Sequence, residues 1–259
     1  MLRWFKVVSA MVAMIALGLI AISCGNSGTH VRIVNAISNN QGIALDVYVN
    51  GAKINNTPLA FQQVYPLQKT PVTYVGVTSG SDTITAFNTG TTTGPVLGNG
   101  GVGNNLTGPE VSLGGGSYYT LLLDGSVQNA NQPPGAVAFT DDNTLPTSGN
   151  VSFRVINASV YLSQQYPAGL EIFFEPNGAS IPPGQTPQIS NLTYGTASNY
   201  TVLPQQAAYS VYATPPGNPF TLIHYQYAQQ NQQITTLVIL DNANATFYYT
   251  NFLEMVDEN

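Results

Sequence analysis

Charged residues are scarce in this chain. They make up 7% of its 259 residues, against about 25% in an average soluble protein. The basic residues are scattered and form no polybasic segment of the kind that binds anionic lipid or a phosphate backbone. Nucleic acid is therefore not an expected partner. Solubility must come instead from uncharged Asn, Gln, Thr and Ser side chains.

Motifs for catalysis and for cofactors are also missing. The two histidines, His30 and His224, lie in no H-E-x-x-H motif, and no G-x-S-x-G nucleophile elbow is present. We expect neither an enzyme activity nor a cofactor. Pairs of carboxylates meet only in three dimensions, so a sequence search misses them. A carbohydrate-active or other hydrolytic accessory enzyme with an unrecognised acidic site is the alternative.

The chain has a single cysteine, Cys24, so it has no disulfide partner within the sequence. Upstream of it stand two basic residues and then sixteen residues without a charge, Val7–Ile22. This order of basic, apolar and small residues is typical of a bacterial export signal. A membrane-spanning helix needs about 20 apolar residues, so a cleaved signal is favoured over an uncleaved anchor with an incidental cysteine.

The segment "AISC" at 21–24 resembles the lipobox of bacterial lipoproteins, although Ala21 stands where Leu is commonest. The resemblance implies that Cys24 is acylated and becomes the first residue of the mature protein. Two or three acyl chains hold a protein stably to a bilayer. Without the signal, four basic residues face twelve acidic ones, a net charge of −8, so membrane attachment would depend on the lipid. Gly25 replaces the Asp that often retains lipoproteins at an inner membrane, which favours the outer membrane or cell surface.

Short runs of alternating apolar and polar residues fill the rest of the chain. In "ALDVYVNG", Leu45, Val47 and Val49 share one face of a predicted strand, and Asn50-Gly51 predicts a turn. Outside the signal we find no stretch with helical spacing and caps. Sheets with one dry face pack those faces together. The predicted class is all-β, most simply a sandwich.

The mature chain contains an internal duplication. "VRIVNAISNNQGIALDVYVNGAKI" (31–54) parallels "FRVINASVYLSQQYPAGLEIFFEPNGASI" (153–181). Further matches, in the same order, are "VTYVGV" with "SNYTVL", "YTLLLDG" with "TTLVILDN", and "AVAFT" (136–140) with "TFYYT" (246–250). Each copy has the size of a domain with its own core. The predicted division is a signal peptide at 1–23, a tether at 24–30, and domains at 31–147 and 148–259.

The two copies of "VRIVNA…LDVYVNG" and "FRVINAS…LEIFFEPNG" behind a lipobox resemble an exported bacterial family, the domain of unknown function 4397 family. The resemblance implies two tandem β-sandwich domains, immunoglobulin-like or transthyretin-like, in an envelope lipoprotein. Family members commonly have His where this chain has Asn35 and Asn157, so no role tied to that His is expected here. The family has no assigned catalytic residue.

Two arginines and two acids occupy matching places in the copies, Arg32 with Asp46 and Arg154 with Glu171. We predict that each arginine forms a structural pair with its acid across strands. Hydrogen bonds to loop carbonyls and anion binding are the alternatives.

A weak calcium candidate lies between the domains at Asp141, Asp142 and Asn143, because Ca²⁺ takes six to eight oxygen ligands. Turn and capping roles explain the same residues without a metal.

Tyrosine is abundant, with 15 in the chain. Exposed tyrosines bind glycans and proteins well, since they offer a large contact area at low entropic cost. The candidates are Tyr225, Tyr227, Tyr248 and Tyr249, and ordinary burial in a sandwich is their alternative role. The predicted function is non-catalytic binding, adhesion or surface display at the cell envelope, with an unknown envelope protein or glycan as partner. A purely structural spacer is a further alternative.

Overall fold

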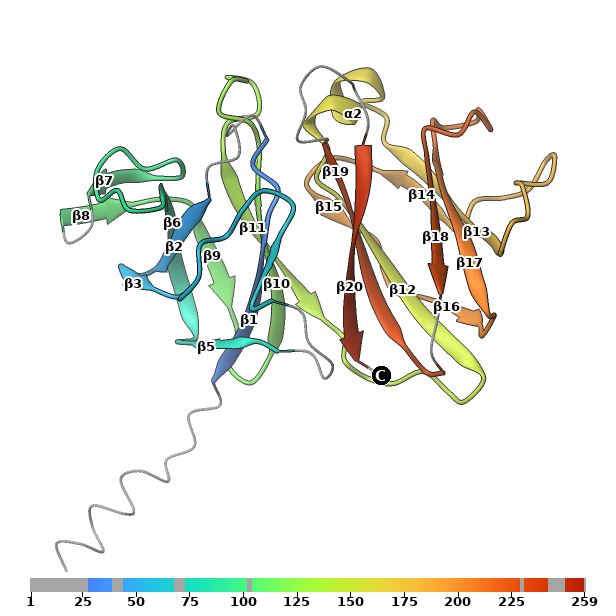
Figure 1. The fold of residues 1–259 in the computed structure, drawn as a ribbon, viewed down its shortest axis with the longest axis horizontal. Coiled ribbons are helices and arrows are strands. Elements are labelled where there is room, and N and C mark those ends of the chain that lie inside the picture. Colours follow the sequence, from blue (N-terminus) through green and yellow to red (C-terminus); the bar gives the residue numbers. More distant parts are fainter. Residues whose placement is uncertain are drawn as a thin grey trace, which may run out of the picture.

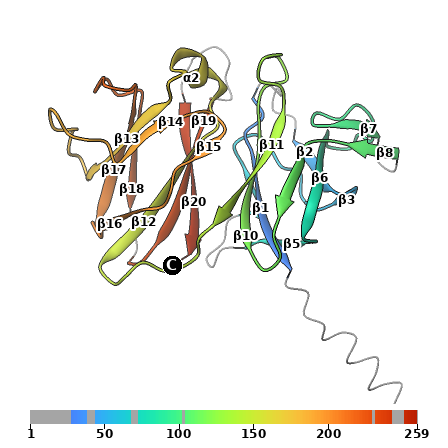
Figure 2. The same ribbon diagram turned by 180° about the vertical axis from the view of Figure 1, so that it is seen from behind.

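The computed structural model describes residues 28–38, 44–67, 73–101, 104–228, 231–241 and 250–258. Cys24 and the predicted signal lie outside these residues. The described chain forms two β-sandwiches that stand side by side (Figures 1 and 2). No helix among the described residues is long and apolar enough to cross a membrane. The all-β prediction is confirmed.

The first sandwich, module 1, packs one mixed sheet against one antiparallel sheet. The mixed sheet has the order β11-β10-β1-β4, with β5 also pairing β1: β1 (Thr29–Asn35), β4 (Val64–Tyr65), β5 (Val75–Val77), β10 (Tyr118–Asp124) and β11 (Gly135–Asp141). The second sheet has the order β3-β2-β6-β9: β2 (Leu45–Val49), β3 (Ala52–Lys53), β6 (Gly80–Asn88) and β9 (Glu110–Leu113). A separate hairpin joins β7 (Asn99–Gly101) and β8 (Asn104–Thr107).

The second sandwich, module 2, repeats this plan. Its mixed sheet has the order β15-β12-β19-β20, with β16 also pairing β12: β12 (Asn150–Asn157), β15 (Thr196–Ala197), β16 (Thr201–Pro204), β19 (Ile234–Asp241) and β20 (Thr250–Glu258). The other sheet has the order β14-β13-β17-β18: β13 (Leu170–Pro176), β14 (Ile189–Leu192), β17 (Ala208–Thr214) and β18 (Ile223–Ala228). The predicted domain boundary lies in the segment between the end of β11 and the start of β12.

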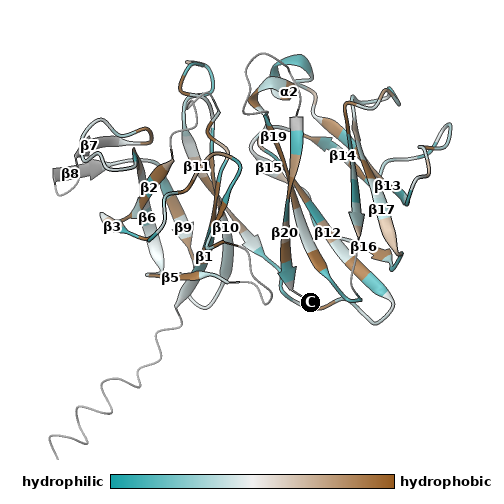
Figure 3. Ribbon diagram, viewed as in Figure 1, coloured by the Kyte–Doolittle hydropathy of each residue, from teal (hydrophilic) through white to brown (hydrophobic). Residues whose placement is uncertain are grey.

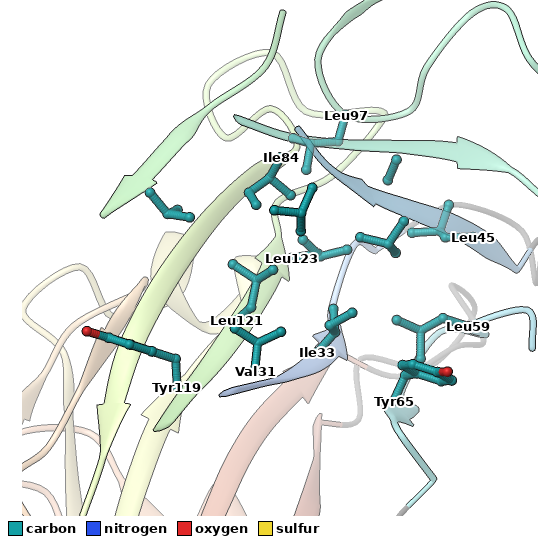
Figure 4. Packing of buried hydrophobic residues seen from close by; sticks show 14 of the residues in the cluster. Val31, Ile33, Leu45, Leu59, Tyr65, Ile84, Leu97, Tyr119, Leu121 and Leu123 are labelled. Carbon is teal, nitrogen blue, oxygen red and sulfur yellow. The ribbon is translucent and has the colours of Figure 1, made fainter. Parts of the chain in front are cut away.

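Each module has its own apolar core between its two sheets. In module 1, Val31 and Ile33 of β1 and Leu121 of β10 point toward Leu45 and Ile84 of the facing sheet (Figure 4). Module 2 builds the same layer around Phe153, which stacks on Phe174 at 4.8 Å between ring centroids. Apolar residues concentrate on the strands of both modules, as Figure 3 shows. The predicted alternation on β2 is confirmed, because Leu45, Val47 and Val49 all belong to the core.

The two central strands are buried on both faces. From Val31 to Asn35 every residue of β1 is buried, and the same holds from Val151 to Asn157 in β12. Each of these strands pairs in parallel with a later strand, β1 with β10 and β12 with β19. The sequences of strands that are buried on both faces are nearly continuous runs of apolar residues. Arg32 and Arg154 interrupt those runs with a buried charge.

The duplication is visible in single hydrogen bonds. The Asn35 side chain accepts from the N–H of Ile37 and donates to the carbonyl of Leu59. Asn157 accepts from the N–H of Ser159 and donates to the carbonyl of Leu192. Both amides thus satisfy the backbone where the chain leaves the central strand. They are parts of the fold, which explains why a buried Asn suits this position.

Two sequence expectations need correction. A helix, α2 (Val160–Gln165), occupies the longer loop of the second copy, where we predicted none. It has only six residues, too few for a periodic pattern, and its one signal is the N-cap Ser159, whose side chain accepts from the N–H of Leu162. The predicted correspondence of "AVAFT" (136–140) with "TFYYT" (246–250) is also wrong. Registers place Phe139 opposite Thr120 and Met255 opposite Thr236, so β11 corresponds to β20 and not to "TFYYT".

Substitution of Leu121 by Ala tests the core of module 1. Leu121 is fully buried in that core, so Leu121→Ala is expected to lower the free energy of unfolding by about 2–5 kcal/mol. Urea unfolding followed by circular dichroism measures the loss. Val202→Ala is the control, because Val202 is 57% exposed and its truncation is expected to cost less than about 0.5 kcal/mol. Equal effects of the two substitutions would contradict the assigned core.

Candidate functional site: a buried charge network between the modules

The mixed sheets of the two modules face each other across an apolar layer. Its buried members are Val34, Ala36, Val64 and Leu122 from module 1 and Ile156, Ala158, Val238, Leu240 and Met255 from module 2. On each central strand these residues alternate with core residues and therefore point outward, toward the other module. The outer faces of the two mixed sheets thus become an interior between the modules.

Two arginines enter this layer from the central strands. Arg32 of β1 contacts Asp257 of β20 with Nη1 at 2.6 Å from the carboxylate, and its Nε lies 3.3 Å from Asp141 of β11. Arg154 of β12 reaches Asp141 with Nη2 at 2.5 Å. All four side chains are almost completely buried. Two cations and two carboxylates therefore form a compact neutral group that spans both modules.

Two threonines connect the arginines to the acids. Thr120 donates to Asp141 at 2.8 Å, and Thr236 donates to Asp257 at 2.6 Å. The same hydroxyl oxygens accept from the arginines: Arg32 Nη2 donates to Thr236 at 3.2 Å and Arg154 Nη2 to Thr120 at 3.1 Å. Arg154 also donates to the carbonyl of Thr140. The three bonds that the arginines donate here cross between the modules, so both modules must keep their places for the network to form.

Two tyrosines close the network at its edges. Tyr74 donates to Asp141 at 3.0 Å, and Tyr200 donates to Asp257 at 2.8 Å. The guanidinium carbon of Arg32 lies 5.7 Å from the centre of the Tyr74 ring, and that of Arg154 lies 4.8 Å from the Tyr200 ring. Each ring therefore contacts a cation with its face while its hydroxyl binds a carboxylate.

Burial and charge act against each other in this network. Desolvation alone would lower the pKa of Arg32 and raise that of Asp257. The neighbouring opposite charges outweigh desolvation: Asp257 and Asp141 raise the pKa of Arg32, and the two arginines lower the pKa of Asp257. Burial also raises the pKa of Tyr74 and Tyr200. Arg32 and Asp257 are thus stabilised in their ionised forms, and Tyr74 and Tyr200 in their neutral forms.

A second polar group lies at the far end of the same interface. Gln62 of module 1 donates to the carbonyl of Asp241 at 2.6 Å, and Asp124 forms a hydrogen bond with Tyr194 of module 2. The Asp241 carboxylate accepts from the hydroxyl of Ser159 at 2.5 Å. Burial raises the pKa of both Asp124 and Asp241. These two shifts are opposite in direction to that of Asp257, whose pKa is lowered.

A family model gives the chain its classification. The model of a domain of unknown function, DUF4397, matches residues 29–163, more than half of the chain. The chain belongs to the DUF4397 family. The match covers module 1 and the start of module 2, including Arg32, Asp141 and Arg154.

Solved structures add only distant likenesses to this DUF4397 chain, and no curated protein matches it. A streptococcal virulence factor described as binding alpha-glucan is 13% identical, with 86% of this chain and 97% of that chain covered and a TM-score of 0.26. A multi-modular glycogen-degrading pneumococcal virulence factor, SpuA, is 12% identical over 86% of this chain and 22% of its own, with a TM-score of 0.26. A candidate cell adhesion protein from Bacteroides uniformis is 11% identical over 90% and 99%, with a TM-score of 0.27. These scores are too low to bear on fold or function.

The predicted pairing of Arg32 with Asp46 is wrong in this DUF4397 chain. Arg32 alternates with the core residues Val31 and Ile33, while Asp46 alternates with the core residues of the other sheet, so the two side chains point to opposite outer faces of the sandwich. Asp46 instead forms an ion pair with Lys53 at 2.8 Å.

The pairing of Arg154 with Glu171 is wrong for the same reason. Phe153 and Val155 flank Arg154, and Leu170 and Ile172 flank Glu171, and all four flanking residues lie in the core of module 2. Arg154 points to the interface and contacts Asp141 there, whereas Glu171 lies on the outer face of the other sheet.

The candidate calcium ligands Asp141, Asp142 and Asn143 do not form a metal site in the described residues either. Asp141 is buried against the two arginines, whose positive charge repels a divalent cation. Asp142 is exposed and accepts from the N–H of Thr144 at 2.9 Å, a turn role. Among the described residues no three His, Cys, Asp or Glu side chains gather as a metal site. Asn143 lies beside these residues without completing a ligand set.

The tyrosines predicted to bind a partner differ in their exposure to solvent. Tyr227 is buried in the core of module 2 and hydrogen-bonds Thr235 at 3.0 Å, so it is no surface contact. Tyr225 is partly exposed and donates to Glu254 at 2.8 Å, and burial raises its pKa to about 12. Tyr248 and Tyr249 lie outside the described residues.

Sequence reasoning found the arginines but missed their partners. Tyr74 and Tyr200 occupy matching places in the two copies, as do Thr120 and Thr236, but their residue types alone do not mark them as partners of the arginines. The equivalence of Asp141 and Asp257 was hidden by the wrong match of the last strand. The sequence feature that indicates this equivalence is the aspartate at the end of both "AVAFTD" and "FLEMVD". What the arrangement does chemically is to fix one module against the other.

Substitution of Asp257 by Asn tests the network. Asp257→Asn leaves the buried Arg32 without its closest carboxylate, so a loss of about 3–5 kcal/mol in the free energy of unfolding is expected. Urea unfolding at pH 7 measures it. Lys53→Gln is the matched control, because it breaks an ion pair in which Lys53 is 41% exposed, and such pairs contribute at most about 1 kcal/mol. A loss as small as that of the control would show that the network does not hold the modules.

The dependence of stability on pH follows from these pKa directions. Asp257 has a lowered pKa in the folded state, so its contribution is present above the ordinary carboxyl pKa of about 4 and is lost as pH falls through the lower folded value. Asp124 and Asp241 have raised pKa values, so their contribution is present at low pH and is lost as pH rises through those values. Unfolding experiments across pH are expected to show highest stability in mild acid and a steep loss below about pH 4.

The variants separate the two effects on stability. Asp257→Asn is expected to remove part of the steep acid loss, and Asp124→Asn part of the gain on mild acidification. A stability profile that these two substitutions leave unchanged would contradict the assignment.

Proposed function

We propose that this chain is an acyl-anchored lipoprotein of the bacterial cell envelope that presents two joined β-sandwich modules for non-catalytic binding. The main support for this proposal is the charge network, because it holds the modules in one orientation. A display or adhesion protein needs such a rigid support to keep its contact surface in place. Binding, display and adhesion are the roles that this arrangement suits best.

The direction of the strands supports an anchor at Cys24. β1 begins at Thr29, shortly after Cys24, and leads away from that end. The arginines lie in the middle of the central strands, and the contact between Gln62 and Asp241 forms where these strands end. The ends of β1, β10, β12 and β19 therefore point away from the proposed membrane side in both modules (Figure 1).

The surface proposed for binding lies at this distal end. It comprises the β10–β11 loop, residues 125–134, and α2, which touch where Gln132 donates to Ser163 at 2.6 Å. The loop is rich in Asn, Gln and Pro and exposes Val127 at 45%. Polar amides beside a small apolar contact suit a glycan or a protein surface. The outer membrane or the cell surface is the proposed location.

The alternative function is hydrolysis at an acidic site. It rests on Asp124 and Asp241, whose pKa values burial raises, and a raised pKa suits a general acid. Ser159 and the backbone N–H of Tyr161 already bind the Asp241 carboxylate, and Tyr194 binds Asp124. These bonds favour a structural role for both acids, so binding without catalysis remains our proposal.

The experiment begins with the anchor. Mass spectrometry of the tryptic peptide Cys24–Arg32 from a membrane fraction is expected to find diacylglyceryl and acyl groups on Cys24. Cys24→Ala is expected to abolish the modification, while Ser27→Ala serves as the matched control. An intact sequence from Met1, or an unmodified Cys24 in the medium, would overturn the proposed anchor.

The same preparation tests binding and catalysis. Soluble protein beginning at residue 25 is applied to glycan arrays and to envelope proteins, and bound glycans are analysed for cleavage. Retention without cleavage is the expected result. Val127→Asp is expected to weaken retention at least tenfold and Val202→Asp to leave it unchanged, since Val202 is exposed elsewhere, on β16. Cleavage products that Asp124→Asn and Asp241→Asn abolish would establish the alternative.

A further inference from the structure

Each module contributes the same four side chains to the interface. They stand at equivalent places in the two modules: an arginine on the central strand, a threonine on its parallel neighbour, an aspartate on the last strand, and a tyrosine just before the short strand, β5 or β16, that pairs with the central strand. The sets are Arg32, Thr120, Asp141 and Tyr74 in module 1 and Arg154, Thr236, Asp257 and Tyr200 in module 2. Each surface therefore carries both charges of the network.

Four contacts of the charge network that cross the interface form two reciprocal pairs. Arg32 binds Asp257 while Arg154 binds Asp141. Arg32 donates to Thr236 while Arg154 donates to Thr120. An interface has two-fold symmetry when residue i of one partner contacts residue j of the other, and residue j of the first partner contacts residue i of the second. This one joins two similar modules as a symmetric dimer would join two identical ones.

The apolar part follows the same rule. Val34 corresponds to Ile156, Ala36 to Ala158 and Leu122 to Val238, and all lie in the shared apolar layer. Phe139 and Met255 correspond on the last strands, and both pack against that layer. These corresponding side chains have similar sizes, whereas at the distal end Leu240 of the layer corresponds to Asp124. Around the charge network, a module therefore meets a surface of nearly its own shape and charge pattern.

We propose that each module's interface is self-complementary, so that its fitting partner is a second copy of the same module. In such a pair, Arg32 faces Asp141 of the second copy, and the reverse contact forms by symmetry. Within one chain the linker 142–149 keeps the unlike modules at high effective concentration. The contacts of Gln62 and Tyr194 at the far end also join unlike modules. Pairing between chains arises when the intrachain pairing is blocked.

Charge reversal in module 2 blocks the intrachain pair in the full chain. Arg154→Asp with Asp257→Arg places like charges opposite Asp141 and Arg32. Module 2 stays complementary to a second copy of itself, and module 1 is unchanged. Sedimentation velocity is expected to show a monomer for the wild-type chain and a dimer or higher oligomer, with at least double the mass, for this variant. A folded variant that stays monomeric would overturn the proposal.

Reversal in both modules is the matched control. Adding Arg32→Asp and Asp141→Arg restores opposite charges across the intrachain interface, and a return to monomer is expected. Persistent oligomers in this fourfold variant would show that the oligomers come from exposed apolar surface and would overturn the proposal.

A cleavage experiment on the wild-type interface decides the question if the charge variants fail to fold. A protease site inserted between Thr144 and Leu145, both exposed, is cut after folding, and the product is held at micromolar concentration. Native mass spectrometry is expected to find pairs of module 1 with module 1 beside the unlike pairs. Unlike pairs alone, or separate modules alone, would overturn the proposal. The outcome does not depend on the proposed display function.

Discussion

The removal of two arginine side chains from water is the constraint on which this structure depends. A buried guanidinium needs a carboxylate in contact and hydrogen bonds for its remaining donors. Neither module supplies the whole set, because Arg32 takes its closest carboxylate from β20 and Arg154 takes its own from β11. Separation of the modules would return four charges and two tyrosines to solvent or leave them unpaired. The network therefore specifies one relative orientation.

This constraint explains other features of the chain. The outer face of each mixed sheet would contact solvent in an isolated sandwich, and here it is apolar apart from the network and the polar group at the far end. The central strands consequently read as apolar on both faces, from Val31 to Asn35 and from Val151 to Asn157. The two arginines that follow Arg3 in the sequence, Arg32 and Arg154, both lie in the interface. Most other polar positions use uncharged side chains, in keeping with the low charge content.

Local patterns predicted the parts of the fold that depend on neighbours in sequence. Alternation located β2, and Asn50-Gly51 marked the turn after it, where Asn50 has a φ of 49° and Gly51 a φ of 79°. Both positions lie in the left-handed region that these residues tolerate. The helix α2 escaped prediction because a single capping serine carries little information. The sequence did not predict that β11 corresponds to β20, because this correspondence is defined by strand register against Thr120 and Thr236 and not by sequence similarity.

The sequence by itself determined the all-β class, the duplication, the resemblance to the DUF4397 family, and the equivalence of Arg32 and Arg154. Tertiary structure decided which acids those arginines bind. The repeat suggested Asp46 and Glu171, but strand alternation turns these side chains away from the arginines, toward the opposite outer face of each sandwich. The true partners, Asp141 and Asp257, lie on distant strands and act across the modules. Such a pairing depends on how two surfaces dock, and no local spacing records it.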